Sequence, residues 1–183
     1  EETLQLQVVG VIRPQDVDEA ELPGESPMAY VLRVARAKAE AGVRSVASAA
    51  PGAPEVAVLA ADTTVAVDGQ ILAKAADAAE ALAMLRRLAG RAHHVHTAVV
   101  LRAGERAFEQ LVTTEVHFRA LTEAELGTYV AGREWHDKAG AYGIQGQGGA
   151  LVAAVYGSYT NVVGLPLAEV VALLRAAGVG GVA

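Results

Sequence analysis

The stretch from His94 to Phe118, HVHTAVVLRAGERAFEQLVTTEVHF, decides the fold. Residues 94–101 and 107–118 are rich in Val, Thr and other residues that favour extended backbone, which predicts two strands. Between them, Ala103-Gly104-Glu105-Arg106 forms a short turn with a glycine inside it. Two strands joined by so short a turn pair in antiparallel fashion, so the stretch predicts a β-hairpin.

Further strands and helices are predicted on both sides of this hairpin. Residues 56–67 form an apolar run that is interrupted by Asp62-Thr63-Thr64 and closed by the turn signal Asp68-Gly69. The other predicted elements are strands over 4–12 and 151–155, helices over 26–41, 77–88, 122–131 and 167–177, and loops over 13–25, 45–54 and 132–149.

The helix boundaries rest on capping signals. Asp77 with Glu80, and Thr122 with Glu125, have the spacing of a capping box. Ser26-Pro27 is a good N-cap and first position. Glycines expected to end helices stand at positions 42, 90 and 178.

Strands and helices therefore intermix without strict βαβ alternation. This pattern favours an α/β fold with a mixed sheet flanked by helices over a doubly wound Rossmann fold. The glycine fingerprints of dinucleotide sites and P-loops are absent. No internal repeat or long linker divides the chain, so residues 1–183 are predicted to form a single domain, or two small lobes that share a cleft.

Composition excludes several classes of protein. The 183 residues are 52% hydrophobic and 20% charged, which allows a sizeable core and argues against global disorder. The net charge is −6 and no basic stripe occurs, so we expect no nucleic-acid partner. The chain has no cysteine, and no apolar run approaches the roughly 18 residues that span a membrane. We therefore expect a cytoplasmic protein without a membrane partner.

Asp62 is the first candidate for chemistry, because it stands near the end of an otherwise apolar strand. A buried carboxylate there needs a partner, and it could serve as a metal ligand or as a general base. The alternative is an aspartate that only caps the strand end. Lys74 lies after the next predicted strand and could neutralise phosphate, although a lone lysine there also fits an ordinary solvated surface residue.

The segment from Glu134 to Gly146, EWHDKAGAYGIQG, is the densest concentration of chemical groups. Its acids, lysine, tyrosine and glutamine stand beside three glycines that permit close backbone approach, which favours a functional loop. The histidines do not form a convincing metal site: His94 and His96 share one face of a strand, and His93 points to the other. His117 and His136 are likewise interpreted as structural or surface residues, and residues 157–167 as a structural connection.

Together these segments resemble the Maf family of nucleotide pyrophosphatases, in the subgroup that prefers dTTP and UTP. The resemblance covers nearly the whole chain in consistent order, and its last two blocks are long enough to be specific. The matching stretches are DVDE at 16–19, AKA at 37–39, ADTTV at 61–65 with Asp68-Gly69 and Lys74, residues 80–88, GRAHHVHT at 90–97, TEV at 114–116, DKAGAYGIQG at 137–146 and NVVGLPL at 161–167.

The resemblance implies a Maf/ITPase-like fold with two lobes around a central cleft, and hydrolysis of nucleoside triphosphates to monophosphate and pyrophosphate. It implies a divalent cation, Mg²⁺ or Mn²⁺ and also Co²⁺, and a homodimer. Asp62 matches the family's general base, and Glu19, next to Asp18, matches an acidic residue that positions metal or water. The remaining matches are lysines that contact phosphates, at 38, 74 and 138, and residues linked to base selectivity, at 63 (Thr) and 145 (Gln).

Two departures from the family pattern affect what is expected. The N-terminal Ser-x-Ser-Pro-Arg-Arg phosphate-binding motif is missing, because Glu1 falls just after its place; the motif would add paired arginines that grip a triphosphate. The usual Gly-Lys-Pro is Ala73-Lys74-Ala75, which keeps the cation and loses the rigid flanks.

Three functions remain open at this point. The first is a hydrolase, a nucleotide pyrophosphatase acting on dTTP and UTP, with CTP also admitted. The second is a house-cleaning enzyme for modified pyrimidine nucleotides such as 5-methyl-UTP or pseudo-UTP. The third is a nucleotide-binding or regulatory module with low activity, linked to control of cell division.

Overall fold

The computed structural model describes residues 16–49 and 56–179. The predicted strand over residues 4–12 lies outside them, and the single-domain organisation stays a prediction. The described helices and strands are α1 (Pro27–Ala49), β1 (Ala57–Val67), β2 (Gln70–Leu72), α2 (Ala78–Leu88), β3 (Ala92–Ala103), β4 (Arg106–Phe118), α3 (Glu123–Ala131), η1 (Gln147–Leu151), β5 (Val152–Tyr156), α4 (Tyr159–Val163) and α5 (Leu167–Ala177).

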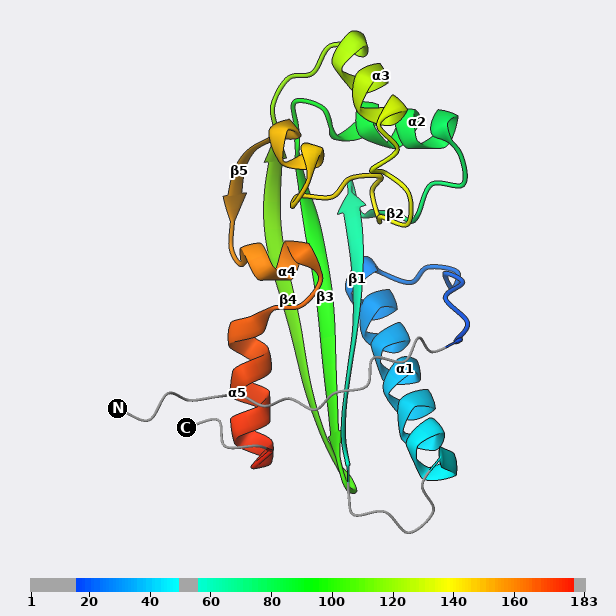
Figure 1. The fold of residues 1–183 in the computed structure, drawn as a ribbon, viewed down its shortest axis with the longest axis vertical. Helices are drawn as coiled ribbons and strands as arrows, with labels where there is room; N and C mark the ends of the chain where they lie inside the picture. Colours follow the sequence, from blue (N-terminus) through cyan, green and yellow to red (C-terminus); the bar gives the residue numbers. More distant parts are fainter. Residues whose placement is uncertain (1–15, 50–55, 180–183) are drawn as a thin grey trace, which may run out of the picture.

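One five-stranded sheet, in the order β2-β1-β3-β4-β5, organises the described part of the chain (Figure 1). The predicted hairpin is confirmed: β3 and β4 pair in antiparallel fashion from Ala92↔His117 to Ala103↔Arg106. Strand β1 pairs with β3 along ten residues, from Ala57↔Ala103 to Ala66↔His94. The α/β class is confirmed, and every strand pairing within the described ranges is antiparallel.

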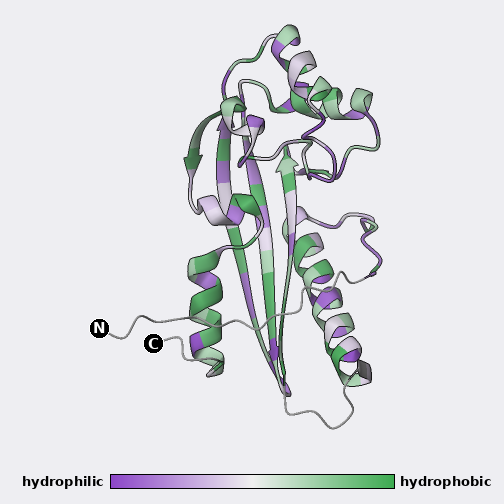
Figure 2. Ribbon diagram, viewed as in Figure 1, coloured by the Kyte–Doolittle hydropathy of each residue, from purple (hydrophilic) through white to green (hydrophobic). Residues whose placement is uncertain are grey.

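Two hydrophobic clusters form on this sheet because strand residues alternate between its faces. On one face, α1 buries Val31, Val34 and Ala35 against Ala98 and Val100 of β3. On the opposite face, α4 and α5 contact β3 and β4. Figure 2 shows α5 as mostly apolar and the segment before α1 as polar. Strand β3 therefore has a helix layer on each side.

The second cluster fills the other end of the sheet, where α2 and α3 pack on one another (Figure 1). Its buried members include Leu85 and Leu88 of α2, Leu126 of α3, and Trp135. The caps expected from the sequence hold both helices in place: Asp77 accepts a hydrogen bond from Glu80 N–H, and Thr122 and Glu125 form a reciprocal capping box. Helices α2 and α3 with this cluster form the α2–α3 lobe, which carries the loop from 132 to 149 over the end of β1.

The predicted end of the helix over 26–41 is wrong. Helix α1 does not end at Gly42 but continues to Ala49, so residues 45–49 of the predicted loop are helical. Gly42 is there for a different reason: a Cβ atom at this position would lie 2.8 Å from Val58 Cγ1, so the glycine lets the helix approach β1. The connection over 157–167 contains the short helix α4, capped by Ser158, which accepts from Asn161 N–H.

Gly140 fixes how the 132–149 loop sits on the sheet, and its replacement gives the first prediction. Its φ is +68°, and an added Cβ would lie 2.8 to 3.1 Å from three side-chain atoms of Val65. At Gly69, φ is +73° but an added Cβ would meet nothing within 4 Å. We expect Gly69→Ala to cost about 1–2 kcal/mol from the backbone alone, and Gly140→Ala about 1–3 kcal/mol more from overpacking.

Urea unfolding of both variants measures this difference. Equal losses of unfolding free energy would show that the contact between Gly140 and Val65 is not tight in solution.

Candidate active site

Lys38 joins the two carboxylates that the sequence singled out as metal or base candidates. Its Nζ lies 2.7 Å from Asp62 Oδ1 and 2.7 Å from Glu19 Oε1. Asp62 projects from β1 towards α1, and its side chain is only 10% exposed. Glu19 comes from the segment before α1 and is 42% exposed. Three residues that are distant in sequence therefore form one charged cluster on the α1 face of the sheet.

Burial decides the proton affinities in this cluster. Burial raises the pKa of Asp62, and the hydrogen bond and charge of Lys38 oppose the rise only in part. Burial lowers the pKa of Lys38, but hydrogen bonds to Asp62 and Glu19 outweigh burial and the net pKa is raised. A carboxylate with a raised pKa beside a lysine that keeps its proton is better suited to accept a proton than an exposed aspartate.

Two side chains of α1 hold the backbone next to Glu19. Tyr30 Oη donates to the Glu19 carbonyl at 3.0 Å. Arg33 donates to the Ala20 carbonyl at 2.8 Å and forms a two-pronged ion pair with Glu25. The acidic segment is thus tied to the helix that also carries Lys38. Sequence reasoning missed Tyr30 and Arg33, because their spacing on α1 shows no sign of the loop they contact.

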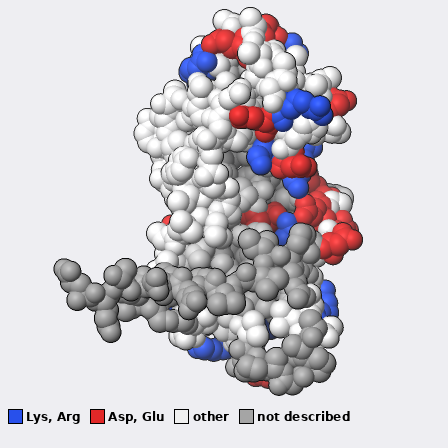
Figure 3. Space-filling model, viewed as in Figure 1, with Lys and Arg blue, Asp and Glu red and all other residues white. Residues whose placement is uncertain are grey.

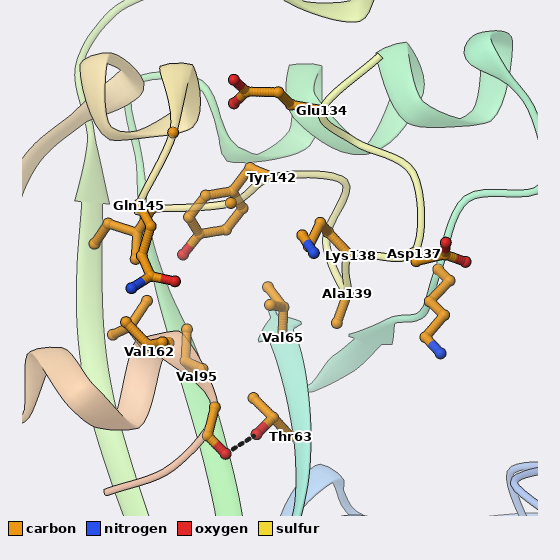
Figure 4. Close-up of a pocket in the computed structure, with 16 residues that line it drawn as sticks. Thr63, Val65, Val95, Glu134, Asp137, Lys138, Ala139, Tyr142, Gln145 and Val162 are labelled. Carbon is orange, nitrogen blue, oxygen red and sulfur yellow. Dashed lines mark hydrogen bonds between the residues drawn. The ribbon is translucent and has the colours of Figure 1, made fainter. Parts of the chain in front are cut away.

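A pocket of about 430 Å³ lies on the other side of β1, between the α2–α3 lobe and α4. Figure 4 shows Gln145 and Lys138 descending from the loop on either side of the Tyr142 ring, with Thr63 below them. The floor and rear wall are apolar, formed by Val65, Val95 and Val162. Polar groups thus converge over an apolar floor, as in a small-molecule site.

Four predicted site residues line this pocket: Thr63, Lys74, Lys138 and Gln145. The other three, Asp62, Lys38 and Glu19, form the cluster on the α1 face. Asp62 and Thr63 are consecutive in β1, so their side chains point to opposite faces of the sheet. Lys74 lines the pocket, and its positive charge also acts to lower the pKa of Asp62. Lys74 therefore lies within electrostatic reach of the carboxylate cluster as well as of the pocket.

Backbone contacts hold together the two segments that carry Lys74 and Lys138. Lys74 pairs with Ala139 in an isolated antiparallel bridge, and Gly140 N–H donates to the Leu72 carbonyl at 2.9 Å. Within residues 16–49 and 56–179, neither Lys74 nor Lys138 forms an ion pair. Figure 3 shows acidic and basic side chains mixed along this edge of the molecule, whereas the visible surface over β5 and α4 is almost uncharged.

The loop above the pocket holds its backbone in an uncommon conformation. Arg133, Asp137 and Ala141 have φ values of 62°, 58° and 60°, a region that costs a non-glycine residue roughly 1–3 kcal/mol each. The predicted functional loop therefore has the backbone strain that is often found at ligand sites.

His93 anchors the same loop to the sheet. The ring is fully buried, and Nε2 lies 2.9 Å from Tyr142 Oη. Both rings also pack edge-to-face against Phe118. His94 and His96 stack on the other face of β3, so the interpretation of the histidines as structural or surface residues agrees with this arrangement.

A carboxylate cluster and lysines beside an apolar pocket form the kind of site that binds phosphorylated ligands. A profile of the family described as Maf-like protein matches residues 1–177, and the chain belongs to this family.

Several similar proteins are each named dTTP/UTP pyrophosphatase. The protein from Myxococcus xanthus is 52% identical over 174 residues, which is 95% of this chain and 85% of that protein. The protein from Bordetella parapertussis is 51% identical over 172 residues, covering 94% and 82%. The protein from Roseobacter denitrificans is 46% identical over 170 residues, covering 93% and 86%. The described helices include none with the length and apolar character needed to cross a membrane.

The buried His93 predicts a pH dependence of stability. Burial lowers its pKa from 6.5 to about 4, so the unfolded chain binds more protons than the folded one between these values. The unfolding free energy should therefore fall as pH drops from 6.5 towards 4. In His93→Gln this contribution, about 3 kcal/mol, should disappear.

Denaturant unfolding at a series of pH values tests this, and above pH 7 the two curves should run parallel. Equal slopes below pH 6.5 would mean that His93 does not titrate as a buried group.

Proposed function

We propose that this protein hydrolyses dTTP and UTP between the α and β phosphates, releasing the monophosphate and pyrophosphate. The observation that carries the proposal is the Lys38-bridged pair of Asp62 and Glu19, which lies directly across β1 from a pocket containing Thr63 and Gln145. One end of the site suits phosphates and the other suits a base. The names of the related proteins support the same activity.

The residues supply each group that the reaction needs. Asp62 accepts a proton from water as the water oxygen bonds to the α phosphorus. The bond from that phosphorus to the bridging oxygen breaks, and pyrophosphate leaves with the electron pair. Lys74 and Lys138 stabilise the charge that gathers on the departing phosphates, because ammonium groups held in place act more strongly than water.

The two carboxylates suit a divalent cation of the Mg²⁺ type. Mg²⁺ and Mn²⁺ prefer oxygen ligands, and Mg²⁺ is commonly bound through one or two carboxylates together with substrate phosphates. Asp62 and Glu19 are such a pair, and they converge on a single point that Lys38 Nζ shares. Among the described residues, no three His, Cys, Asp or Glu side chains gather around one point, so phosphate oxygens would complete the coordination shell. The cation would neutralise and align the phosphate chain.

The side chain of Gln145 supports a substrate whose base is a pyrimidine with an imide edge. Its side chain is exposed in the pocket and makes no hydrogen bond within the described part of the chain, so both its donor and its acceptor are available. Uracil and thymine present a donor beside two acceptors on this edge. 5-Methyl-UTP and pseudo-UTP keep the same edge and remain substrates under this proposal. The cytoplasmic location and the homodimer stay predictions.

Asp62→Asn tests the mechanism. The amide cannot accept the proton, so kcat for pyrophosphate release from dTTP should fall at least about a hundredfold. The matched control is Asp77→Asn, because Asp77 caps α2 and asparagine caps a helix nearly as well. Both variants are assayed with Mg²⁺, Mn²⁺ and Co²⁺. Unchanged turnover in Asp62→Asn, or release of orthophosphate alone, would exclude the mechanism. Binding without turnover by the unaltered protein would favour the regulatory alternative.

Gln145→Ala tests the recognition of the base. We expect the preference for dTTP over dGTP, measured as the ratio of kcat/KM values, to fall by about tenfold, because one or two hydrogen bonds to the base are lost. Gln147→Ala, two residues further along and outside the pocket lining, is the control. An unchanged ratio in Gln145→Ala would remove this residue from base selection.

A further inference from the structure

A buried threonine pair lies at the base of the pocket. Thr63 lines the pocket, and its Oγ1 lies 2.8 Å from Oγ1 of Thr97 on the neighbouring strand β3. Thr97 is fully buried, so it cannot touch a ligand. Thr97 Oγ1 lies 3.2 Å from the Asn161 carbonyl, and Thr63 Oγ1 lies 3.4 Å from the Gly164 carbonyl, the bond dashed in Figure 4.

The two hydroxyl groups carry one hydrogen each, and both hydrogens are used inside the protein. A 2.8 Å contact between two oxygens requires a hydrogen between them. If Thr63 donates it, Thr97 donates to the Asn161 carbonyl. If Thr97 donates it, the Thr63 hydrogen is held only by the 3.4 Å contact with the Gly164 carbonyl, and the Asn161 carbonyl loses its bond from Thr97. The first arrangement makes the two shorter bonds, 2.8 Å and 3.2 Å, and is therefore favoured. In it Thr63 faces the pocket with a lone pair and with no hydrogen to give.

Asn161 holds these acceptors in place. Its side chain is fully buried, and Nδ2 donates to the Val95 carbonyl at 3.0 Å and to Thr114 Oγ1 at 2.9 Å. Its own carbonyl also accepts from Gly164 N–H at 2.9 Å, which closes the turn after α4. The α4 backbone is therefore fixed to β3 and β4, which keeps the Asn161 carbonyl in place as the acceptor for Thr97.

We propose that Thr97 is a positioning residue that makes Thr63 a hydrogen-bond acceptor, so that the pocket selects a base that presents an N–H donor, the imide of uracil or thymine. Cytosine presents an acceptor at the corresponding N3 position and meets a lone pair. The inference rests on the proposed function and adds the atom, Thr63 Oγ1, by which the pocket distinguishes uracil and thymine from cytosine.

Thr97→Val tests this inference because it removes the hydroxyl and keeps the shape. Thr63 then holds its hydrogen only through the 3.4 Å bond to Gly164 and can turn it to an acceptor on the base. We expect the ratio of kcat/KM for dTTP to that for dCTP to fall about tenfold, mainly because KM for dCTP decreases. Thr97→Ser, which keeps the hydroxyl, should retain the ratio. Thr113→Val, whose hydroxyl contacts His96 at 2.9 Å, is the control.

A merely structural role for Thr97 would lower the turnover of both nucleotides together and leave the ratio unchanged, which would overturn the inference. Two analogues identify the donor in the unaltered protein. N3-methyl-dTTP should be a poor substrate, and 3′-deoxythymidine triphosphate should have a KM close to that of dTTP. The reverse result would place a sugar hydroxyl at Thr63 and overturn the assignment to the imide.

Calorimetric binding of dTMP and dCMP separates this inference from the proposed function. If no triphosphate yields pyrophosphate, the proposed function fails, while the binding ratio of the two monophosphates still reports the hydrogen-bond polarity. A preference for dTMP that is lost in Thr97→Val supports the inference, and a preference that persists overturns it.

Discussion

The alternation of side chains along β1 is the constraint on which the site depends. Asp62 and Thr63 are neighbours in sequence, and a strand must send them to opposite faces. Asp62 therefore meets α1, with Lys38 and the Glu19 segment, and Thr63 meets α4 and the pocket. A nucleotide that uses both groups has to pass the edge of one strand, with its phosphates on one side and its base on the other. Under the proposed function, the helices on the two faces contact different ends of the same ligand.

The antiparallel ladder of β1, β3 and β4 makes this division rigid. Each strand is held along ten or more residues, and the buried Val99 and Val100 of β3 point into opposite helix layers. The loop over the pocket has no such ladder. It relies on Gly140 against Val65, the bridge from Lys74 to Ala139, and the buried contact between Tyr142 and His93. Separate point contacts of this kind, rather than a ladder, thus position a loop whose own backbone is strained.

Much of the fold could be predicted from local signals. The hairpin, the caps at Asp77 and Thr122 and the final helix depend on residues close in sequence, and the structure agrees with them. The end of α1 could not be predicted, because Gly42 is explained only by Val58, which lies beyond the helix. The seven predicted site residues do gather at β1. Their division between two faces, and the roles of Tyr30, Thr97 and Asn161, depend on contacts across the sheet that no spacing along the chain reveals.

The hydroxyl contact between Thr63 and Thr97 also bears on how such a chain can change over generations. Replacing either threonine with a residue that has no hydroxyl removes the 2.8 Å bond and leaves the other hydroxyl with only its longer bond to a backbone carbonyl. The two positions belong to different strands and are 34 residues apart, yet they act as one hydrogen-bonded pair. A substitution at either position changes the hydrogen bonding at the other, so we expect the effects of changes at the two positions on base preference to be coupled rather than additive.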